Sequence, residues 1–362
     1  MLTESLSVHD TVSAPAEDCY KTLSISVIVP VRNEARFIER TLTQLVAQDY
    51  DSQRFEVLVV DGQSTDGTSD LVAQFAAQHP DQNVRLFDNP RRLSSAARNI
   101  GTREARGDVV VIVDGHCELN GQYLTRLADA FSRSGADCIG RPQPLDIDGA
   151  TVLQRAIAAA RSSRLGHHPD SHIYSSAEGF VPAKSVAVAY RLSVFEKVGP
   201  FDETFDACED VELNHRIDRA GLRCFFTPLV AVHYAPRATL GGLFRQLVRY
   251  GRGRVRLARK HPETFSWGLL PPTLLVAGLV VGLPLSFTAV WLAVIYAVAI
   301  AIYAAVVLAA SASLALRLRC LRLLFALPLV FLTIHVASGM GMLWEVLHRT
   351  APTTAGTVES HP

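Results

Sequence analysis

Ser24-Ile-Ser-Val-Ile-Val-Pro30 is a short apolar segment of the kind that forms a strand buried on both faces of a sheet. Phe55-Glu-Val-Leu-Val-Val60 repeats the pattern and ends at Asp61, and further strands are expected at residues 84–87 and 108–113. Helical patterns lie between these segments, for example at residues 94–105. Strands that alternate with helices at this spacing predict an α/β domain with a mostly parallel sheet.

Three polar or turn-forming positions fall at the expected strand ends. Pro30, Asp61 and Asp114 each lie at or directly after a strand, and ligands of parallel α/β sheets bind at the carboxyl ends of the strands. The first strand is not followed by GxGxxG, and the chain has no GxxxxGK[ST]. The sequence therefore argues against a Rossmann dinucleotide site and against a P-loop NTPase.

The charge of the chain is unevenly distributed. The 362 residues include 35 basic and 35 acidic ones, and 49% are hydrophobic, which is too apolar for a disordered chain. Residues 241–362 have a balance of +8, which leaves −8 for residues 1–240. This asymmetry indicates two parts in different surroundings. The six cysteines are scattered without a CxxC pair, as is typical of reduced cytosolic thiols.

The basic half contains the apolar segments. Residues 264–316 contain no Asp, Glu, Lys or Arg, which is room for two membrane spans, at 269–287 and 289–310. Leu323–Leu347 supplies a third, whose one acid, Glu345, lies near its end. The alternative is a buried helical core, but so long an uncharged stretch would make an unusual soluble surface.

Basic residues flank the expected spans, and the positive-inside rule places them in the cytoplasm. The first two spans then form a hairpin with an external turn near residues 286–288, and three spans put the C-terminal tail outside. The acidic N-terminus is not a signal peptide, so residues 1–240 are expected in the cytosol. The flanking residues are Arg245, Arg249, Arg252, Arg254, Arg256, Arg259 and Lys260 before the first span, and Arg317, Arg319 and Arg322 after the second.

Several ordered blocks carry a family resemblance. They are Ser26-Val-Ile-Val-Pro-Val-Arg-Asn-Glu34, Val59-Val-Asp-Gly-Gln-Ser-Thr-Asp-Gly-Thr68, Ser95-Ala-Ala-Arg-Asn-Ile-Gly101, Val111-Ile-Val-Asp-Gly-His116, Gly199-Pro-Phe-Asp-Glu203 and Glu209-Asp210. Together they resemble family 2 glycosyltransferases of the GT-A fold over residues 24–260. The chain looks like the membrane-attached members of this family that act in exopolysaccharide assembly, of the succinoglycan glucosyltransferase type.

The resemblance implies a domain order. A GT-A glycosyltransferase domain is expected at residues 24–238, after an N-terminal extension at 1–23. A basic amphipathic interfacial helix is expected at 239–262, and a membrane domain with about three transmembrane helices at 263–348. Residues 349–362 would form a C-terminal tail.

The resemblance also implies a nucleotide diphosphate sugar as donor, with a UDP-sugar favoured. Asp61 would accept a hydrogen bond from the base, and Arg98 would pair with the diphosphate. Turn and cap chemistry is the alternative explanation of both Asp61 and Asp66, but the position of Asp61 matches the family motif. The base and ribose cradle would be formed by Pro30, Arg32 and Glu34.

Asp114-Gly-His116 stands where the family has Asp-x-Asp, which implies a divalent cation, Mn2+ or Mg2+, at the leaving diphosphate. Asp114 is a hard-oxygen ligand. Because His116 replaces the second acid, and imidazole suits Mn2+ better than Mg2+, the metal is left open; Glu118 could substitute. His233 lies where relatives place a late metal-binding histidine, although a lone histidine is more often structural.

Glu209-Asp210 opens a helix expected at residues 210–220. Asp210 matches the family's base, which takes the acceptor proton during inverting transfer, and Glu209 would support it or bind the acceptor. Ordinary capping by acids at a helix N-terminus is the alternative.

Gln246-Leu-Val-Arg249-Tyr250 looks like the QxxRW motif of processive polysaccharide synthases, with Tyr in place of Trp. It lies on the basic stretch Leu240–Lys260, which is typical of a helix on an anionic cytoplasmic leaflet. Arg249 would contact a phosphate of the donor or of a lipid acceptor. The neighbouring spans favour the membrane over nucleic acid as the partner of this stretch.

These inferences predict an inverting glycosyltransferase of the cell (inner) membrane, multi-pass and with its catalytic domain in the cytoplasm. It would move a sugar from a nucleotide diphosphate sugar to a lipid-linked, polyprenyl-type acceptor. Three spans are too few for a polymer channel, so single sugar addition is expected. The alternatives are a polyprenyl-phosphate glycosyl synthase and a non-catalytic membrane subunit that binds nucleotide-sugar.

Overall fold

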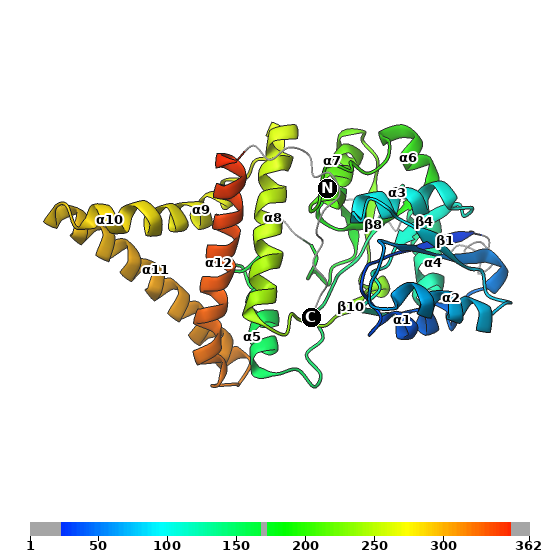
Figure 1. Cartoon of the computed structure of the whole chain (residues 1–362), viewed down its shortest axis with the longest axis horizontal. Coiled ribbons are helices and arrows are strands. Elements are labelled where there is room, and N and C mark those ends of the chain that lie inside the picture. The colour runs from blue at the N-terminus through cyan, green and yellow to red at the C-terminus, as the bar shows by residue number, and fades with distance from the viewer. Residues whose placement is uncertain (1–22, 168–171, 349–362) are drawn as a thin grey trace, which may run out of the picture.

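The computed structural model describes residues 23–167 and 172–348. The expected tail at 349–362, and all of the expected extension except Leu23, lie outside these residues. An α/β unit is followed by an arm of long helices (Figure 1). The fold class expected from the sequence is confirmed: a mostly parallel sheet with flanking helices precedes C-terminal apolar helices.

The central sheet has eight strands in the order β3-β2-β1-β4-β8-β6-β9-β7. Strands β1, β2, β3 and β4 are mutually parallel, and β6 is parallel to β9, whereas β8 and β7 run antiparallel to their neighbours. The strands are β1 (Ile25–Val31), β2 (Phe55–Asp61), β3 (Val84–Asp88), β4 (Val109–Ile112), β6 (Cys138–Gly140), β7 (Gly179–Val181), β8 (Ala187–Arg191) and β9 (Cys224–Phe226). A separate antiparallel ribbon pairs β5 (Cys117–Glu118) with β10 (His233–Tyr234).

Both faces of the sheet are covered, which explains why its central strands are almost wholly apolar. Successive side chains of a strand point to opposite faces, so Val27 and Val29 pack on one side and Ile28 on the other. The first side is covered by α1 (Ile38–Val46), α2 (Thr68–Gln78) and α4 (Tyr123–Ser134). The second is covered by α3 (Ser94–Glu104), α6 (Leu192–Val198) and α7 (Glu209–Arg219).

The arm contains three segments that are long and apolar enough to cross a membrane: Trp267–Ser286, Val290–Arg317 and Leu323–Leu347. The first consists of α9 (Leu270–Ala277) and α10 (Leu283–Ser286), joined by a π-helical turn at Gly278–Gly282. The other two are the helices α11 (Val290–Arg317) and α12 (Leu323–Leu347). The α10–α11 end projects away from the sheet unit (Figure 1).

Two further helices join the arm to the sheet unit. They are α5 (Val152–Arg161) and α8 (Leu240–Lys260). Leu243 and Leu247, part of the apolar stripe expected on α8, belong to one buried cluster with α5, α11 and α12. This side of α8 therefore contacts protein.

The backbones of α8 and α12 approach closely. A Cβ atom added at Gly341 would lie 2.2 Å from the carbonyl oxygen of Val248, and one added at Gly251 would lie 2.4 Å from that of Ser338. Only glycine allows this separation without displacement of a helix.

We expect Gly341→Ala to destabilise the α8–α12 contact, because the added methyl overlaps a backbone carbonyl that cannot turn away. Overpacking of this kind costs about 1–3 kcal/mol. The thermal unfolding midpoint of the full chain in detergent should fall. Gly278→Ala is the matched control, since a Cβ there has nothing within 4 Å; equal midpoints for the two variants would contradict the packing.

Candidate active site

The candidate residues gather at the carboxyl edge of the sheet. Asp61 is the last residue of β2 and lies opposite Val31 at the end of β1. Asp114 follows β4, which pairs with β1 on its other side. Glu209 and Asp210 form the first turn of α7. The parallel strands thus bring segments that are far apart in sequence to one edge.

The loop after β2 orients Asp61. Its carboxylate is buried and accepts hydrogen bonds from the backbone N–H of Ser64 at 3.0 Å and from the Ser64 hydroxyl. A carboxylate has about four acceptor sites, so Asp61 can still accept a ligand N–H. Gln63 in this loop and Asn33 in the loop after β1 have φ values of 55° and 56°. Such left-handed backbone costs energy for non-glycine residues and concentrates at functional sites.

Arg32 lies beside this loop, and part of its guanidinium group forms no hydrogen bond with the described residues. Its Nε and Nη1 atoms are buried without a hydrogen-bond partner among the described residues. Burial lowers the pKa of Arg32, the charge of Arg92 lowers it further, and Asp61 partly offsets both. A buried guanidinium with open donors is suited to a ligand that carries oxygen acceptors. Pro30 lies one residue before the end of β1, opposite Val60 of β2.

Asp114 is held by residues that the sequence analysis did not select. Its Oδ2 accepts a hydrogen bond of 2.9 Å from the hydroxyl of Tyr234. Burial would raise the pKa of Asp114, but the charges of His116 and Arg98, with that hydrogen bond, lower it. Within the described part of the chain, no hydrogen bond reaches Oδ1 of Asp114, which leaves one hard oxygen for a cation. Arg141, fully buried, lies against Tyr234 with a 3.3 Å contact to its hydroxyl.

His116 forms a pair with Glu34. The Nδ1 atom of His116 lies 2.9 Å from Oε1 of Glu34, a buried carboxylate. Burial alone would lower the pKa of His116, but Glu34 and Asp114 outweigh burial and raise it. A metal ion binds only the neutral form of an imidazole. Because Glu34 favours the protonated form of His116, a metal ion at His116 would have to compete with a proton. Glu34, expected in the donor cradle, therefore acts here on His116.

Arg98 connects the acids of the edge. Its Nη1 lies 3.2 Å from Oε1 of Glu209, and both side chains are nearly buried. Burial would lower the pKa of Arg98, but the carboxylates of Glu209, Asp210 and Asp114 raise it. The guanidinium also lies over the ring of Phe201. Arg98, expected at a diphosphate, is thus an internal counter-ion for three acids.

Asp210 is the more accessible member of the acidic pair. It is half-buried, whereas Glu209 is 6% exposed. Its Oδ1 accepts a hydrogen bond of 2.8 Å from the backbone N–H of Val211. Cys208 precedes the pair with a left-handed φ of 65°. The carboxylate that remains reachable from outside is therefore the one expected to be the base.

Two expected site residues have other surroundings. Asp66 is exposed, and its oxygens accept hydrogen bonds from the backbone N–H groups of Ala35 and Thr68, so it fixes two loops. His233 is exposed and lies opposite Glu118 in the β5–β10 ribbon. Because side chains alternate along a strand and Tyr234 reaches Asp114, His233 points to the opposite face of the ribbon. Glu118 itself forms an ion pair with Arg40.

A polar surface on α8 is formed by Gln246 and Tyr250 together with Arg237, which lies before the helix. Gln246 donates to the Tyr250 hydroxyl at 3.3 Å and accepts from Nε of Arg237 at 3.3 Å. Burial lowers the pKa of Arg237, and the nearby charges of Arg249 and Arg161 lower it further. Three arginines from α5, α8 and the segment before α8 therefore converge here. Sequence reasoning found only Arg249, because nothing near Arg161 or Arg237 forms a recognisable motif.

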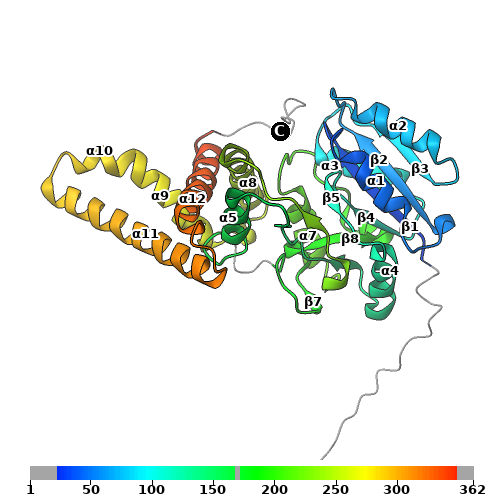
Figure 2. The ribbon, with the colours of Figure 1, turned by 90° about the horizontal axis from the view of Figure 1, so that it is seen from below.

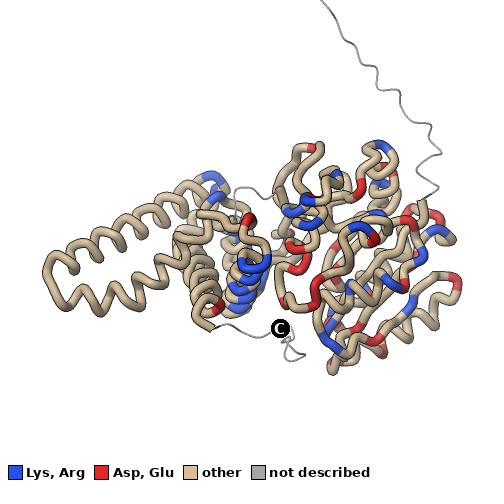
Figure 3. The backbone as a smooth tube through the Cα atoms, turned by 90° about the horizontal axis from the view of Figure 1, so that it is seen from above, with Lys and Arg blue, Asp and Glu red and all other residues tan. Residues whose placement is uncertain are grey.

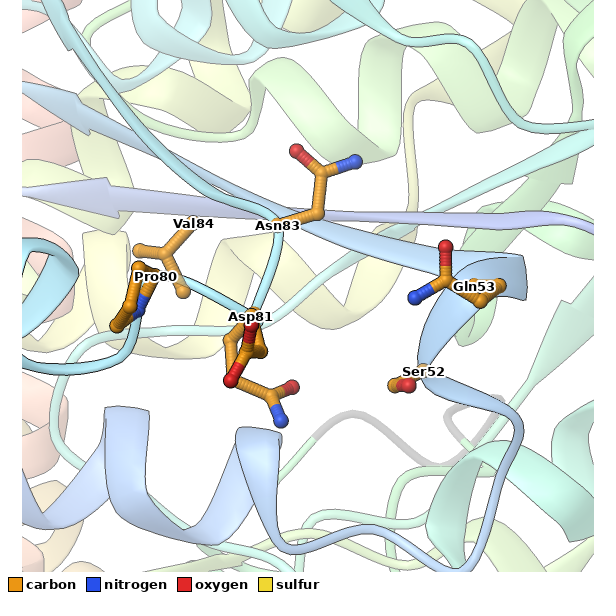
Figure 4. Close-up of a pocket in the computed structure, with 7 residues that line it drawn as sticks. Ser52, Gln53, Pro80, Asp81, Asn83 and Val84 are labelled. Atoms are coloured by element: carbon orange, nitrogen blue, oxygen red, sulfur yellow. The ribbon is translucent and has the colours of Figure 1, made fainter.

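A surface hollow at the other edge of the sheet is unrelated to these residues. Figure 4 shows this hollow of about 300 Å3, which lies beside the amino ends of β2 and β3. Its lining is Ser52, Gln53, Pro80, Asp81, Gln82, Asn83 and Val84. It contains none of the groups described above.

Comparisons with known proteins assign a family. The family model described as Glycosyl transferase family 2 matches residues 26–187, and that described as Glycosyl transferase family group 2 matches residues 109–344. Succinoglycan biosynthesis protein ExoA of Rhizobium meliloti (strain 1021) is 33% identical over 248 residues, which cover 68% of this chain and 73% of that protein.

Two further similarities are informative. The Methanococcus voltae protein named dolichyl N-acetyl-alpha-D-glucosaminyl phosphate 3-beta-D-2,3-diacetamido-2,3-dideoxy-beta-D-glucuronosyltransferase is 26% identical over 251 residues, 67% of this chain and 76% of its own. The solved mannosyltransferase PcManGT from Pyrobaculum calidifontis, in complex with GDP-Man and Mn2+, aligns with a TM-score of 0.57 and 24% identity. The alignment covers 90% of this chain and 89% of that one, and it supports the fold.

We expect Arg98→Met to destabilise the sheet unit strongly, because it leaves Glu209 buried without its cation. Removing one partner of a buried ion pair costs about 3–5 kcal/mol. The unfolding midpoint of the full chain should drop by several degrees more than that of Arg91→Met. Arg91 pairs with Glu203 nearby, but its side chain is 51% exposed, where ion pairs contribute little. Equal effects of the two variants would show that Arg98 is not the counter-ion of these acids.

Proposed function

Because the chain belongs to glycosyl transferase family 2, we propose that it transfers a sugar from a nucleotide diphosphate sugar to a lipid-linked, polyprenyl-type acceptor. Transfer would proceed with inversion at the cytoplasmic surface of a cell membrane. The observation that carries this proposal is the grouping of Asp114, Glu209 and Asp210 around Arg98 at the carboxyl edge of the sheet. A cation ligand and a base are thereby close to each other, as transfer between two bound substrates requires.

The donor would bind across the loops after β1 and β2. Asp61 is fixed by Ser64 and is suited to accept an N–H of the base. The unpartnered Nε and Nη1 of Arg32 are suited to oxygens of the ribose or diphosphate. Pro30 and Glu34 complete this wall in the proposal, and Asp66 holds its loops in place. The Pyrobaculum mannosyltransferase, which is in complex with GDP-Man, supports this class of donor, and we favour a UDP-sugar.

We propose a divalent cation, Mn2+ or Mg2+, at Asp114. When bound, it neutralises the charge that develops on the diphosphate leaving group. The open Oδ1 of Asp114 and its lowered pKa fit this ligand role. In the proposal, His116 is the second ligand. Its partner Glu34 orients the ring, and it also favours the protonated form of His116, which does not bind a metal ion. The orientation of His233 makes it the weaker candidate.

Asp210 is the proposed base. It would take the proton of the acceptor hydroxyl as the sugar carbon is attacked from the face opposite the diphosphate. Glu209, buried against Arg98, would hold the first turn of α7 in position. The positive charge of Arg98 lies close to both carboxylates of this turn.

The acceptor phosphate would lie against α8. Gln246 and Tyr250 form a hydrogen-bonded pair there, and Arg249, Arg237 and Arg161 add positive charge. A lipid phosphate carries the matching negative charge. The Methanococcus voltae relative, whose name specifies a dolichyl phosphate sugar as substrate, supports a lipid-linked acceptor.

Two alternatives follow from the same site. A polyprenyl-phosphate glycosyl synthase would use bare polyprenyl phosphate, and an assay of that acceptor against polyprenyl diphosphate-sugar separates the two activities. A non-catalytic nucleotide-sugar-binding subunit would explain the replacement of an acid by His116. The reachable carboxylate of Asp210 beside Arg98 favours catalysis.

We expect Asp210→Asn to abolish sugar transfer while nucleotide diphosphate binding is retained, because the change removes the base and leaves the donor loops intact. Transfer by the purified full chain and UDP binding by thermal shift would be measured together. Glu196→Gln, which neutralises an exposed acid on α6, should leave both unchanged. Near-normal turnover of Asp210→Asn would disprove the assignment of the base.

Metal preference provides a separate prediction for His116. His116→Asp creates the family's two-acid pattern and removes the proton held by Glu34, so activity with Mg2+ should rise relative to activity with Mn2+. Mutation of residues that support a metal ligand typically costs about 10- to 100-fold in metal affinity or activity, and we expect the replacement of His116 to shift the activity ratio by at least about tenfold. Asp114→Asn should lose the response to both metals, and an unchanged ratio for His116→Asp would remove His116 from the metal site.

A further inference from the structure

The last turns of α12 are held by cations of α8. Glu345, near the end of α12, is 1% exposed. Its carboxylate lies 3.0 Å from Nε of Arg256 and 3.2 Å from Nε of Arg252, and Nη1 of Arg259 is 3.6 Å away. Arg259 also donates to the Glu345 backbone carbonyl at 2.6 Å. This end of α12 is therefore fixed to a helix that precedes the membrane hairpin in sequence.

The middle and the beginning of α12 have similar neighbours. His335, in its middle, lies 3.0 Å from the backbone carbonyl of Leu165, in the loop after α5. Leu323 and Leu327, in its first turns, belong to the buried cluster that contains Ile157 of α5 and Leu243 of α8. Helices α8 and α12 run side by side in both views (Figures 1 and 2).

This arrangement conflicts with a spanning α12. A helix of 25 residues that crosses a bilayer separates its two ends by about 37 Å. Helix α8 carries seven Lys or Arg residues along its length and cannot enter the hydrocarbon core. Irregular backbone that is exposed to lipid does not occur within the hydrocarbon core, and the loop at Leu165 includes the exposed residues Ser162 and Arg164. Because α12 contacts α8 and the loop after α5 along its whole length, it lies at the same depth in the membrane as they do.

The hairpin of α9–α10 and α11 differs from α8 and α12 in its direction and in its lack of charge. Figure 2 shows α10 and α11 lengthwise, whereas α8 and α12 are seen end-on, so the hairpin crosses the direction of α12. The hairpin has no charged residue between its flanks, and the Lys and Arg positions of the arm lie along α8 and near the end of α11 (Figure 3). Its two segments, of 20 and 28 residues, are each long enough to cross.

We propose that the chain crosses the membrane twice, through the α9–α10 and α11 hairpin, and that α12 lies in the membrane surface beside α8. Both ends of α12, and the C-terminal tail that follows it, are then on the side of the catalytic unit. The partner of α12 is the lipid bilayer itself. The uncovered side of α12 bears apolar residues: Phe325, Leu329, Leu332, Met340, Trp344 and Leu347.

Charge and composition favour lipid over a second protein on this side of α12. The hairpin also exposes apolar side chains, among them those of Phe287 and Val290 at more than 80% exposure. Helix α8, on the other side of α12, adds cations that attract an anionic leaflet. Trp344 stands near the end of the stripe, at the depth where tryptophan anchors helices to lipid headgroups.

The test is cysteine labelling of the full chain in intact cells with a membrane-impermeant maleimide. Cys19 and Cys320 are first replaced by Ser, because the four remaining cysteines, Cys117, Cys138, Cys208 and Cys224, are buried. One variant then carries Thr288→Cys at the hairpin turn, and two others carry Thr354→Cys or Ser360→Cys in the tail. We expect labelling at position 288 in intact cells, and labelling at both tail positions only after permeabilisation. Transferase activity in the same membranes shows that each variant is folded.

Two results would overturn the proposal. Labelling of the tail positions in intact cells would mean three crossings, with α12 as a span. Protection of position 288 together with the tail would mean that the hairpin dips into the membrane without crossing it. Both results leave the proposed sugar transfer untouched, because activity is measured separately from topology.

Discussion

The acidic edge of the sheet depends on the buried guanidinium of Arg98. Three carboxylates, those of Asp114, Glu209 and Asp210, lie close enough to it to raise its pKa. Without a cation, carboxylates gathered in a buried site repel each other and take up protons. An ionised Asp114 is needed to hold a metal. The charge of one arginine of α3 therefore acts on the proposed metal ligand and lies beside the proposed base.

The position of Arg98 is itself set by contacts between distant segments. Its neighbour Asn99 donates to the carbonyl oxygen of Phe201 at 2.9 Å and accepts from the Phe201 N–H at 2.8 Å. Asn99 also donates to Glu203. The blocks at residues 95–101 and 199–203 are thus one structural unit, and its function is to place Arg98 beneath the first turn of α7.

A second ion network continues from the acidic edge to the membrane unit. Nη1 of Arg256 lies 2.7 Å from Asp206, and Nε of the same residue lies 3.0 Å from Glu345. Asp206 is four residues before Asp210. One side chain of α8 therefore connects the segment that bears the proposed base with helix α12. In the proposed topology, this connection would hold the site in a fixed orientation to the membrane surface, where the proposed lipid-linked acceptor would lie.

The sequence predicted the strands β1, β2 and β4, the start of α7 and the full extent of α8, because these follow from local apolar patterns and cap chemistry. It did not predict Tyr234 as the partner of Asp114, which is 120 residues away, or Glu34 as the partner of His116. Such pairs depend on sheet order, which periodicity does not contain. Our proposal that α12 does not cross the membrane also rests on contacts between distant segments. The hydropathy of α12 shows that the helix is apolar enough to span a membrane, but it does not show how the helix is oriented, and one acid near a helix end is compatible with a span. The fold adds the observation that Glu345 is bound by three arginines of α8. If the chain crosses twice, every charge of the basic half lies on one side of the membrane, as the positive-inside rule prefers.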